Sequence, residues 1–208
     1  MSIKPILFNT EMVRAILDGR KSCTRRLVTT RRKDACGFYV TKKADGTFSG
    51  IYEYDENESM FDNPLMPPYQ PGDILYVRET WCGLPVNEAG HMRGHTIYYY
   101  KADGELRPKG WRGTWHPSIH MPKEAARIWL KVTDVRVERL QEITSEQICR
   151  EGVEVEYPHV LNGEEKRYAF SRLWDSTIKK SDLDRYGWNA SPWVWVIEFE
   201  RCEKPEGV

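Results

Sequence analysis

The pattern of apolar and polar residues predicts a chain of short strands interrupted by three short helices. Alternation with a period of two, or a short unbroken apolar run, is typical of strands. Such patterns mark the segments 6–8, 27–28, 74–81, 96–100, 126–140 and 193–200. A hairpin is also expected, with arms at 37–40 and 48–52. Within 126–140 the apolar positions shift by one residue near Thr133, which predicts a bulge or a bend.

Three other segments space their apolar residues as helices do. The first follows Thr10, which stands at an N-cap position, and ends at Gly19. The second runs from a capping box at Thr144 to Gly152, and the third covers 164–178. With about six mostly antiparallel strands, these helices predict an α+β fold built on a small β-barrel.

Length and composition predict a single domain that spans 1–208. Hydrophobic residues make up 40% of the chain and charged residues 30%, as in ordinary globular proteins. The segment near 30–70 is the least regular, with an acidic run followed by several prolines. It is therefore predicted to be a surface insertion.

The overall charge balance argues against tight, non-specific binding to long nucleic acid. The chain has 31 basic and 31 acidic residues, whereas such binding needs many uncompensated cations. The basic residues are nevertheless concentrated between Arg14 and Lys33, where Asp18 is the one acid. A local patch of this kind can hold a nucleotide phosphate.

Cysteine usage predicts a reducing compartment. The five cysteines are widely spaced, odd in number and without a CxxC pair, so neither a disulfide framework nor a structural zinc site is expected. The first residues lack an apolar signal core, and no apolar run reaches ~18 residues. We expect a cytoplasmic protein with no membrane partner.

Two histidine pairs raise the question of a metal site. His91 and His95 are four residues apart, as are His116 and His120. A glycine and a proline interrupt the pairs, so neither sits on a good helix, and no acidic third ligand is evident. We expect no metal and no cofactor.

Charged and potentially reactive side chains are concentrated in the segment 19–26. It contains one lysine, three arginines, two hydroxyls and one thiol between the first helix and the next apolar run. Two interpretations are open, a solvated basic turn and a turn that lines a pocket. Cys23 is a weaker candidate nucleophile than Thr24, because no histidine lies near it in the sequence.

The order of motifs resembles the ASCH family of the PUA-like superfamily. The resemblance rests on the segments 19–24, 72–79, 127–144 and 193–199 and spans nearly the whole chain. The layout is most similar to the larger ASCH-like proteins of phages and prophages. It implies a PUA-like β-barrel with a cleft beside the first helix, and a second insertion near 82–120.

The resemblance also implies a chemistry. Some family members are amidohydrolases that remove the acyl group from N4-acylated cytidines such as N4-acetylcytidine. Their lysine and threonine lie in a Gly-x-Lys-x-x-Thr pattern that matches Lys21 and Thr24, and their glutamate matches Glu151. Thr24 would be the nucleophile, Lys21 its base and Glu151 a proton shuttle to the exocyclic nitrogen.

One geometric condition applies to this mechanism. Lys21 and Thr24 are three residues apart, and odd spacing places side chains on opposite faces of a regular strand. They converge only if the backbone turns or bulges between them. Gly19 makes such a turn plausible.

Four further residues are predicted to contact the substrate: Arg26, Arg78, Glu79 and Trp81. Arg26 could hold a phosphate or a base edge, and Trp81 could stack on a base. The common structural alternatives are a surface arginine, an ion-pair partner for Glu79 and core packing for Trp81.

The expected partner is a small modified nucleoside or a short RNA. Because other family members bind RNA, a non-catalytic module that binds RNA or a modified base is the alternative function. The third candidate function is that of a phage accessory protein, which binds a host protein.

Overall fold

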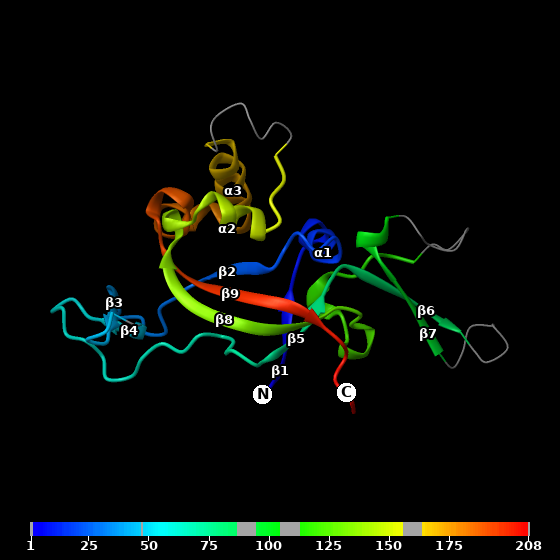
Figure 1. Cartoon of the computed structure of the whole chain (residues 1–208), viewed down its shortest axis with the longest axis horizontal. Helices are drawn as coiled ribbons and strands as arrows, with labels where there is room; N and C mark the ends of the chain where they lie inside the picture. Colours follow the sequence, from blue (N-terminus) through cyan, green and yellow to red (C-terminus); the bar gives the residue numbers. More distant parts are fainter. Residues whose placement is uncertain (1, 47, 87–94, 105–112, 156–163, 208) are drawn as a thin grey trace. The chain divides into compact units, whose positions relative to one another are not determined.

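The computed structural model describes residues 2–46, 48–86, 95–104, 113–155 and 164–207 (Figure 1). In these residues nine strands are found: β1 (Ile3–Leu7), β2 (Cys23–Leu27), β3 (Gly37–Lys42), β4 (Phe48–Tyr54), β5 (Ile74–Arg78), β6 (Trp81–Val86), β7 (His95–Tyr100), β8 (Trp129–Arg139) and β9 (Trp193–Cys202). The α-helices in the same residues are α1 (Thr10–Leu17), α2 (Ser145–Arg150), α3 (Glu164–Thr177) and α4 (Leu183–Tyr186). None of the helices in the described residues is long and apolar enough to cross a membrane.

The chain divides into two compact units. The first consists of Met1–Ser22, Gly72–Val132 and Phe199–Val208, and the second of Cys23–Pro71 and Thr133–Glu198. Strands β8 and β9 contribute residues to both units. Each unit contains strands and helices, so the mixed α+β class is confirmed. The single domain predicted from the sequence stays a prediction.

The first unit is built around a three-strand arrangement. Strand β1 runs parallel to β5, with Ile3 opposite Ile74, and β5 runs antiparallel to the beginning of β8. Ile74 also belongs to a buried cluster with Met121 and Trp129. The β6–β7 hairpin lies in the same unit, and its Trp81 packs against this cluster.

The strand predicted over 74–81 is in fact two strands, so that prediction was wrong. Strand β5 ends at Arg78 and β6 begins at Trp81. Between them the backbone N–H of Glu79 points to the sulfur of Met121 instead of a neighbouring strand, and the Glu79 side chain is buried. Glu79 places a charge on the face predicted for Leu75 and Val77, so the apolar alternation is interrupted at the residue after β5 ends.

The second unit has its own core beneath α2 and α3. Strand β2 pairs antiparallel with β9, and β9 neighbours β8 in the strand order. Ile148 of α2 and Trp174 of α3 pack with Val194 and Val196 of β9. The predicted hairpin is confirmed as β3–β4, with a register irregularity at Thr41.

The observed architecture differs from the predicted one mainly in the β-barrel. Within the described residues the strand pairings end at β1 on one side and β2 on the other, and no closed barrel is detected. The strand and helix counts are also higher than predicted. Helix α4 has only four residues, too few for a helical repeat to be visible in the sequence.

The structure corrects one of the predicted helix caps. The Thr144 capping box is present, and Gly19 and Gly152 adopt φ values of +76° and +81° at the helix ends, as expected. The N-cap of α1, however, is Asn9 and not Thr10. The Asn9 side chain accepts a hydrogen bond from the backbone N–H of Met12 at 2.8 Å.

Replacing Asn9 by alanine should therefore destabilise the first unit. Loss of an N-cap acceptor costs about 1 kcal/mol, which urea unfolding of Asn9→Ala should detect as a lower midpoint. Thr10→Ala is the matched control, because Thr10 is already inside the helix. A larger loss in Thr10→Ala than in Asn9→Ala would contradict the assignment of the cap.

Candidate active site

Strand β2 is buried on both faces although it carries polar side chains. Cys23, Thr24 and Arg25 are 2%, 2% and 4% exposed. Charged side chains are almost never so deeply buried unless they are paired. The partners of Arg25 therefore define the site.

The Arg25 guanidinium is held by two carboxylates and an amide. Its Nη1 donates to Glu151 Oε1 at 3.0 Å, and its Nη2 donates to Glu138 Oε2 at 3.2 Å and Gln147 Oε1 at 3.1 Å. In the described residues the Nε atom of Arg25 has no hydrogen-bond partner. Glu151 was predicted from the sequence, whereas Arg25 was missed as its partner. The only signal was its place in the basic segment.

Neighbouring residues of β2 point to opposite faces of the strand. Cys23 and Arg25 share the face toward α2, since the Cys23 thiol and the Arg25 guanidinium both donate to Gln147. Thr24 and Arg26 therefore point to the other face. Thr24 is thus separated by the strand itself from most of the Arg25 contacts.

The Glu151 carboxylate is buried beside the Arg25 guanidinium of β2. It follows the last residue of α2 as the C-cap, where Gly152 turns the chain. It contacts Arg25 directly and also acts electrostatically on Arg26, which points to the opposite face. A role for Glu151 beside Thr24 stays a prediction.

The ion pairs continue from Arg25 across the second unit. Glu138 accepts a hydrogen bond from Arg136 Nε at 2.6 Å, and Arg136 Nη1 donates to Glu198 Oε1 at 2.6 Å. Arg150 of α2 also binds Glu198. Alternating charges thus tie α2 to the three strands beneath it, which fixes the orientation of Glu151.

Burial and nearby groups of the second unit shift the pKa of Arg26. Burial lowers the pKa of its guanidinium, against the opposing effects of Tyr69 and Glu151. Burial likewise raises the pKa of the Tyr69 phenol, against the effect of Arg26. Tyr69 comes from the predicted insertion near 30–70, so this segment contributes to the surroundings of β2.

Lys21 is buried in the first unit. It is 3% exposed and follows the C-terminus of α1, where its backbone N–H donates to the carbonyl of Ala15 at 2.9 Å. Its Nζ lies 5.6 Å from the ring centroid of Phe8, a cation–π distance. Regular strand begins only at Cys23, so the backbone does depart from a strand between Lys21 and Thr24. The approach of the two side chains stays a prediction.

Glu79 is buried against an arginine. Arg127 Nε and Nη2 donate to its two carboxylate oxygens at 2.9 and 3.0 Å, and Arg127 also binds Asp103. Burial raises the pKa of the Glu79 carboxyl, although Arg127 acts in the opposite direction. The ion-pair alternative for Glu79 is therefore present, and its contact with substrate stays a prediction.

Arg78 and Trp81 have structural contacts in the first unit. Arg78 donates from Nε to the carbonyl of Met121 at 2.9 Å and from Nη2 to the carbonyl of Ile119. Trp81 packs against Tyr98 and His116, with ring centroids 5.8 and 5.1 Å away. The buried indole N–H of Trp81 has no acceptor in the described residues.

No metal centre is found in the part of the chain that the structure describes. No group of three or more histidine, cysteine, aspartate or glutamate side chains there could hold an ion. His91 of the first predicted pair lies outside the described residues. None of the five cysteines forms a disulfide.

Comparisons with known proteins leave the family open. No protein-family model matches the chain, and no curated protein matches it. One similar solved structure is an ASCH domain from Lactobacillus crispatus, with 14% identity, a TM-score of 0.39, and coverage of 96% of this chain and 79% of the other. Another, hypothetical protein PH0355, has 16% identity and a TM-score of 0.35, covering 97% of this chain and 100% of the other. At these scores neither likeness carries an argument about fold or function.

Removing the charge of Arg25 should destabilise the protein strongly. Arg25→Met removes the cation that binds the buried Glu151 carboxylate, and breaking a buried ion pair typically costs about 3–5 kcal/mol in unfolding free energy. Arg20→Met is the control, because the Arg20–Asp18 pair is exposed and such pairs contribute about 0–1 kcal/mol. Equal unfolding midpoints for the two variants in urea would contradict the proposed importance of this network.

The network should also make stability depend on pH. Burial alone would raise the pKa of Glu198, but Arg150 and Arg136 outweigh it and hold that pKa below its ordinary value. Glu198 therefore stabilises the fold above its unfolded pKa of about 4.3, and this contribution is lost as pH falls through the lower folded pKa.

Glu198→Gln should accordingly be less stable than the wild type at neutral pH, with the difference shrinking as the solution is acidified. Urea unfolding at a series of pH values measures it. Glu200→Gln is the control, since Glu200 is exposed and its ion pair with Lys131 is long, at 4.0 Å. A difference that grows on acidification would contradict the assigned direction.

Proposed function

We propose that this chain is an ASCH-type amidohydrolase that removes the acyl group from an N4-acylated cytidine or a related modified nucleoside. The observation that carries the proposal is the burial of the three predicted catalytic residues. Lys21, Thr24 and Glu151 are 3%, 2% and 5% exposed. Solvated side chains, the ordinary alternative for Lys21 and Glu151, would be far more exposed. The alternative for Thr24, an ordinary strand residue, is compatible with its burial.

The position of Glu151 adds support. A carboxylate at a helix C-terminus faces the negative end of the helix dipole, an unfavourable place for it. Here the hydrogen bond from Arg25 offsets that cost and holds the carboxylate in place. Structures often keep a locally unfavourable residue where function requires it.

The reaction would proceed by nucleophilic acyl transfer. The neutral amine of Lys21 takes the proton from Thr24 Oγ1 as this oxygen forms a bond to the acyl carbon. Glu151 relays this proton from the Lys21 ammonium to the exocyclic nitrogen as the C–N bond breaks, and cytidine leaves. Water then attacks the acyl-threonine ester and releases the carboxylic acid, which restores Thr24. The mechanism requires Lys21 Nζ to reach Thr24 Oγ1.

Arg25 and Arg26 would have separate roles in this mechanism. Arg25 positions Glu151, and its Nη1 and Nη2 atoms already donate hydrogen bonds within the protein. Arg26 shares the face of Thr24, so it is the predicted substrate residue best placed to hold a base edge. Arg78, Glu79 and Trp81 stay proposed substrate contacts.

Release of cytidine from N4-acetylcytidine tests the proposal directly. The wild type should release it, and Lys21→Ala and Glu151→Gln should each slow the reaction by about 10²- to 10⁴-fold. Thr24→Val should be inactive, whereas Thr24→Ser keeps the hydroxyl and should keep part of the activity. Chromatography of the products gives the rates.

Ser22→Ala is the matched control, since it removes a nearby hydroxyl that has no predicted role. A wild type that releases no cytidine, but binds the nucleoside or a short RNA, would support the non-catalytic alternative. Full activity in Thr24→Val would exclude Thr24 as the nucleophile.

A further inference from the structure

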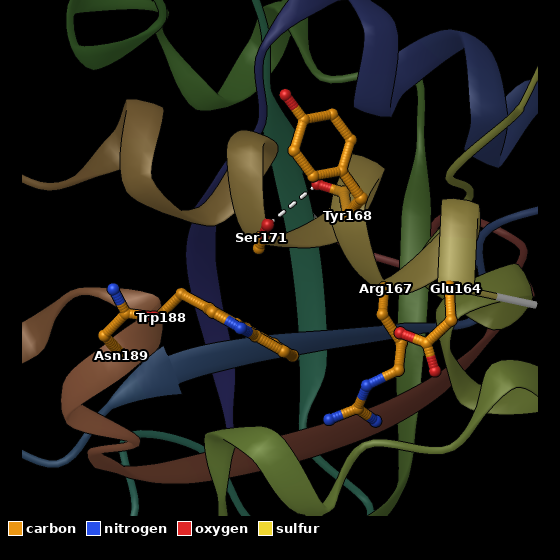
Figure 2. Close-up of a pocket in the computed structure, with 6 residues that line it drawn as sticks. All are labelled: Glu164, Arg167, Tyr168, Ser171, Trp188 and Asn189. Atoms are coloured by element: carbon orange, nitrogen blue, oxygen red, sulfur yellow. Dashed lines mark hydrogen bonds between the residues drawn. The ribbon is translucent and has the colours of Figure 1, made fainter.

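A pocket in the second unit lies apart from all residues discussed as catalytic or substrate-binding. It has a volume of about 530 Å³ and is lined by Glu164, Arg167, Tyr168 and Ser171 of α3 and by Trp188 and Asn189 of the short 3-10 helix Trp188–Ala190 (Figure 2). Volumes of about 300–1,000 Å³ are typical of small-molecule sites.

Trp188 is fixed in place by its backbone. Its N–H donates to Asp175 Oδ1 at 2.7 Å, and its carbonyl accepts from Gln141 Nε2 at 2.8 Å. The ring of Phe170 meets its ring edge-on at 6.0 Å. The two hydrogen bonds fix the main chain of Trp188, and its partly exposed indole packs against Phe170, which reduces the entropy lost when a ligand packs on it.

Arg167 forms part of the same wall but is poorly suited to binding an anion. Its Nη1 and Nη2 donate to the carbonyls of Ile143 and Gln141 at 2.8 and 2.9 Å. Its guanidinium carbon lies 5.2 Å from the ring centroid of Trp188. The carboxylate of Glu164 lines the same pocket and would repel a phosphate. The pocket therefore favours an uncharged ligand.

The remaining groups suit a flat ring with polar edges. Tyr168 is 65% exposed, so its phenol ring can stack on a ligand. Asn189 is exposed and offers both a donor and an acceptor through its amide. Figure 2 shows Tyr168 and Trp188 projecting from the two elements that frame the pocket.

We propose that this pocket binds the base of an uncharged nucleoside at a non-catalytic site. The base stacks on the aromatic side chains, and Asn189 forms hydrogen bonds with its edge. A nucleoside 5′-monophosphate binds more weakly than the nucleoside, because of Glu164. The site is independent of the proposed hydrolysis, since it uses none of the same residues.

Calorimetric titration of the full chain with adenosine, cytidine and uridine tests the proposal. Tyr168→Ala should weaken binding of the preferred nucleoside by about tenfold, in the range found for removal of one base-stacking side chain. Asn189→Ala should weaken it by up to about tenfold, through loss of a hydrogen bond. Tyr39→Ala is the control, because Tyr39 is also an exposed tyrosine of the second unit. Unchanged affinity in both pocket variants would overturn the proposal, as would equal or tighter binding of the monophosphate or of methyl glucoside.

Photo-crosslinking locates the bound base. 5-Iodouridine should crosslink to a peptide that contains Tyr168 or Trp188, as identified by mass spectrometry. Crosslinks found only in other peptides would overturn the assignment. The Tyr168→Ala variant should still hydrolyse N4-acetylcytidine at the wild-type rate if the wild type does so, which separates failure at this pocket from failure of the proposed activity.

Discussion

The buried guanidinium of Arg25 is the constraint on which the second unit depends. A charge placed in the interior is stable only when paired and hydrogen-bonded. Its partners come from strand β8 and from the region of α2, so both must lie against β2 at once. The apolar core beneath α2 and α3 contributes burial, while the charges determine which orientation of α2 is acceptable.

Helix α2 is too short to hold its orientation alone. It has six residues, and isolated helices of this length are unstable in water. Arg167 binds the carbonyls of Gln141 and Ile143 just before its start, and Arg25 binds Glu151 just after its end. The candidate acid and the wall of the nucleoside pocket are therefore supported from opposite ends of one helix.

Local sequence patterns predicted the elements whose cause is local. The Thr144 capping box and the β3–β4 hairpin depend on nearby residues and were found where expected. The pairing of Arg25 with Glu151 depends on residues far along the chain, so no spacing could show it. The burial of the candidate residues was likewise invisible in the sequence, which allowed a solvated basic turn equally well.

The distance along the chain between Arg25 and Glu151 has a consequence for biosynthesis. They are 126 positions apart, and at roughly 5–20 residues per second the ribosome needs about 6–25 s to make the intervening chain. Until then Arg25 cannot pair with Glu151, and burial of β2 against α2 would lack this carboxylate. The final packing of β2 therefore depends on the part of the unit that is synthesised last.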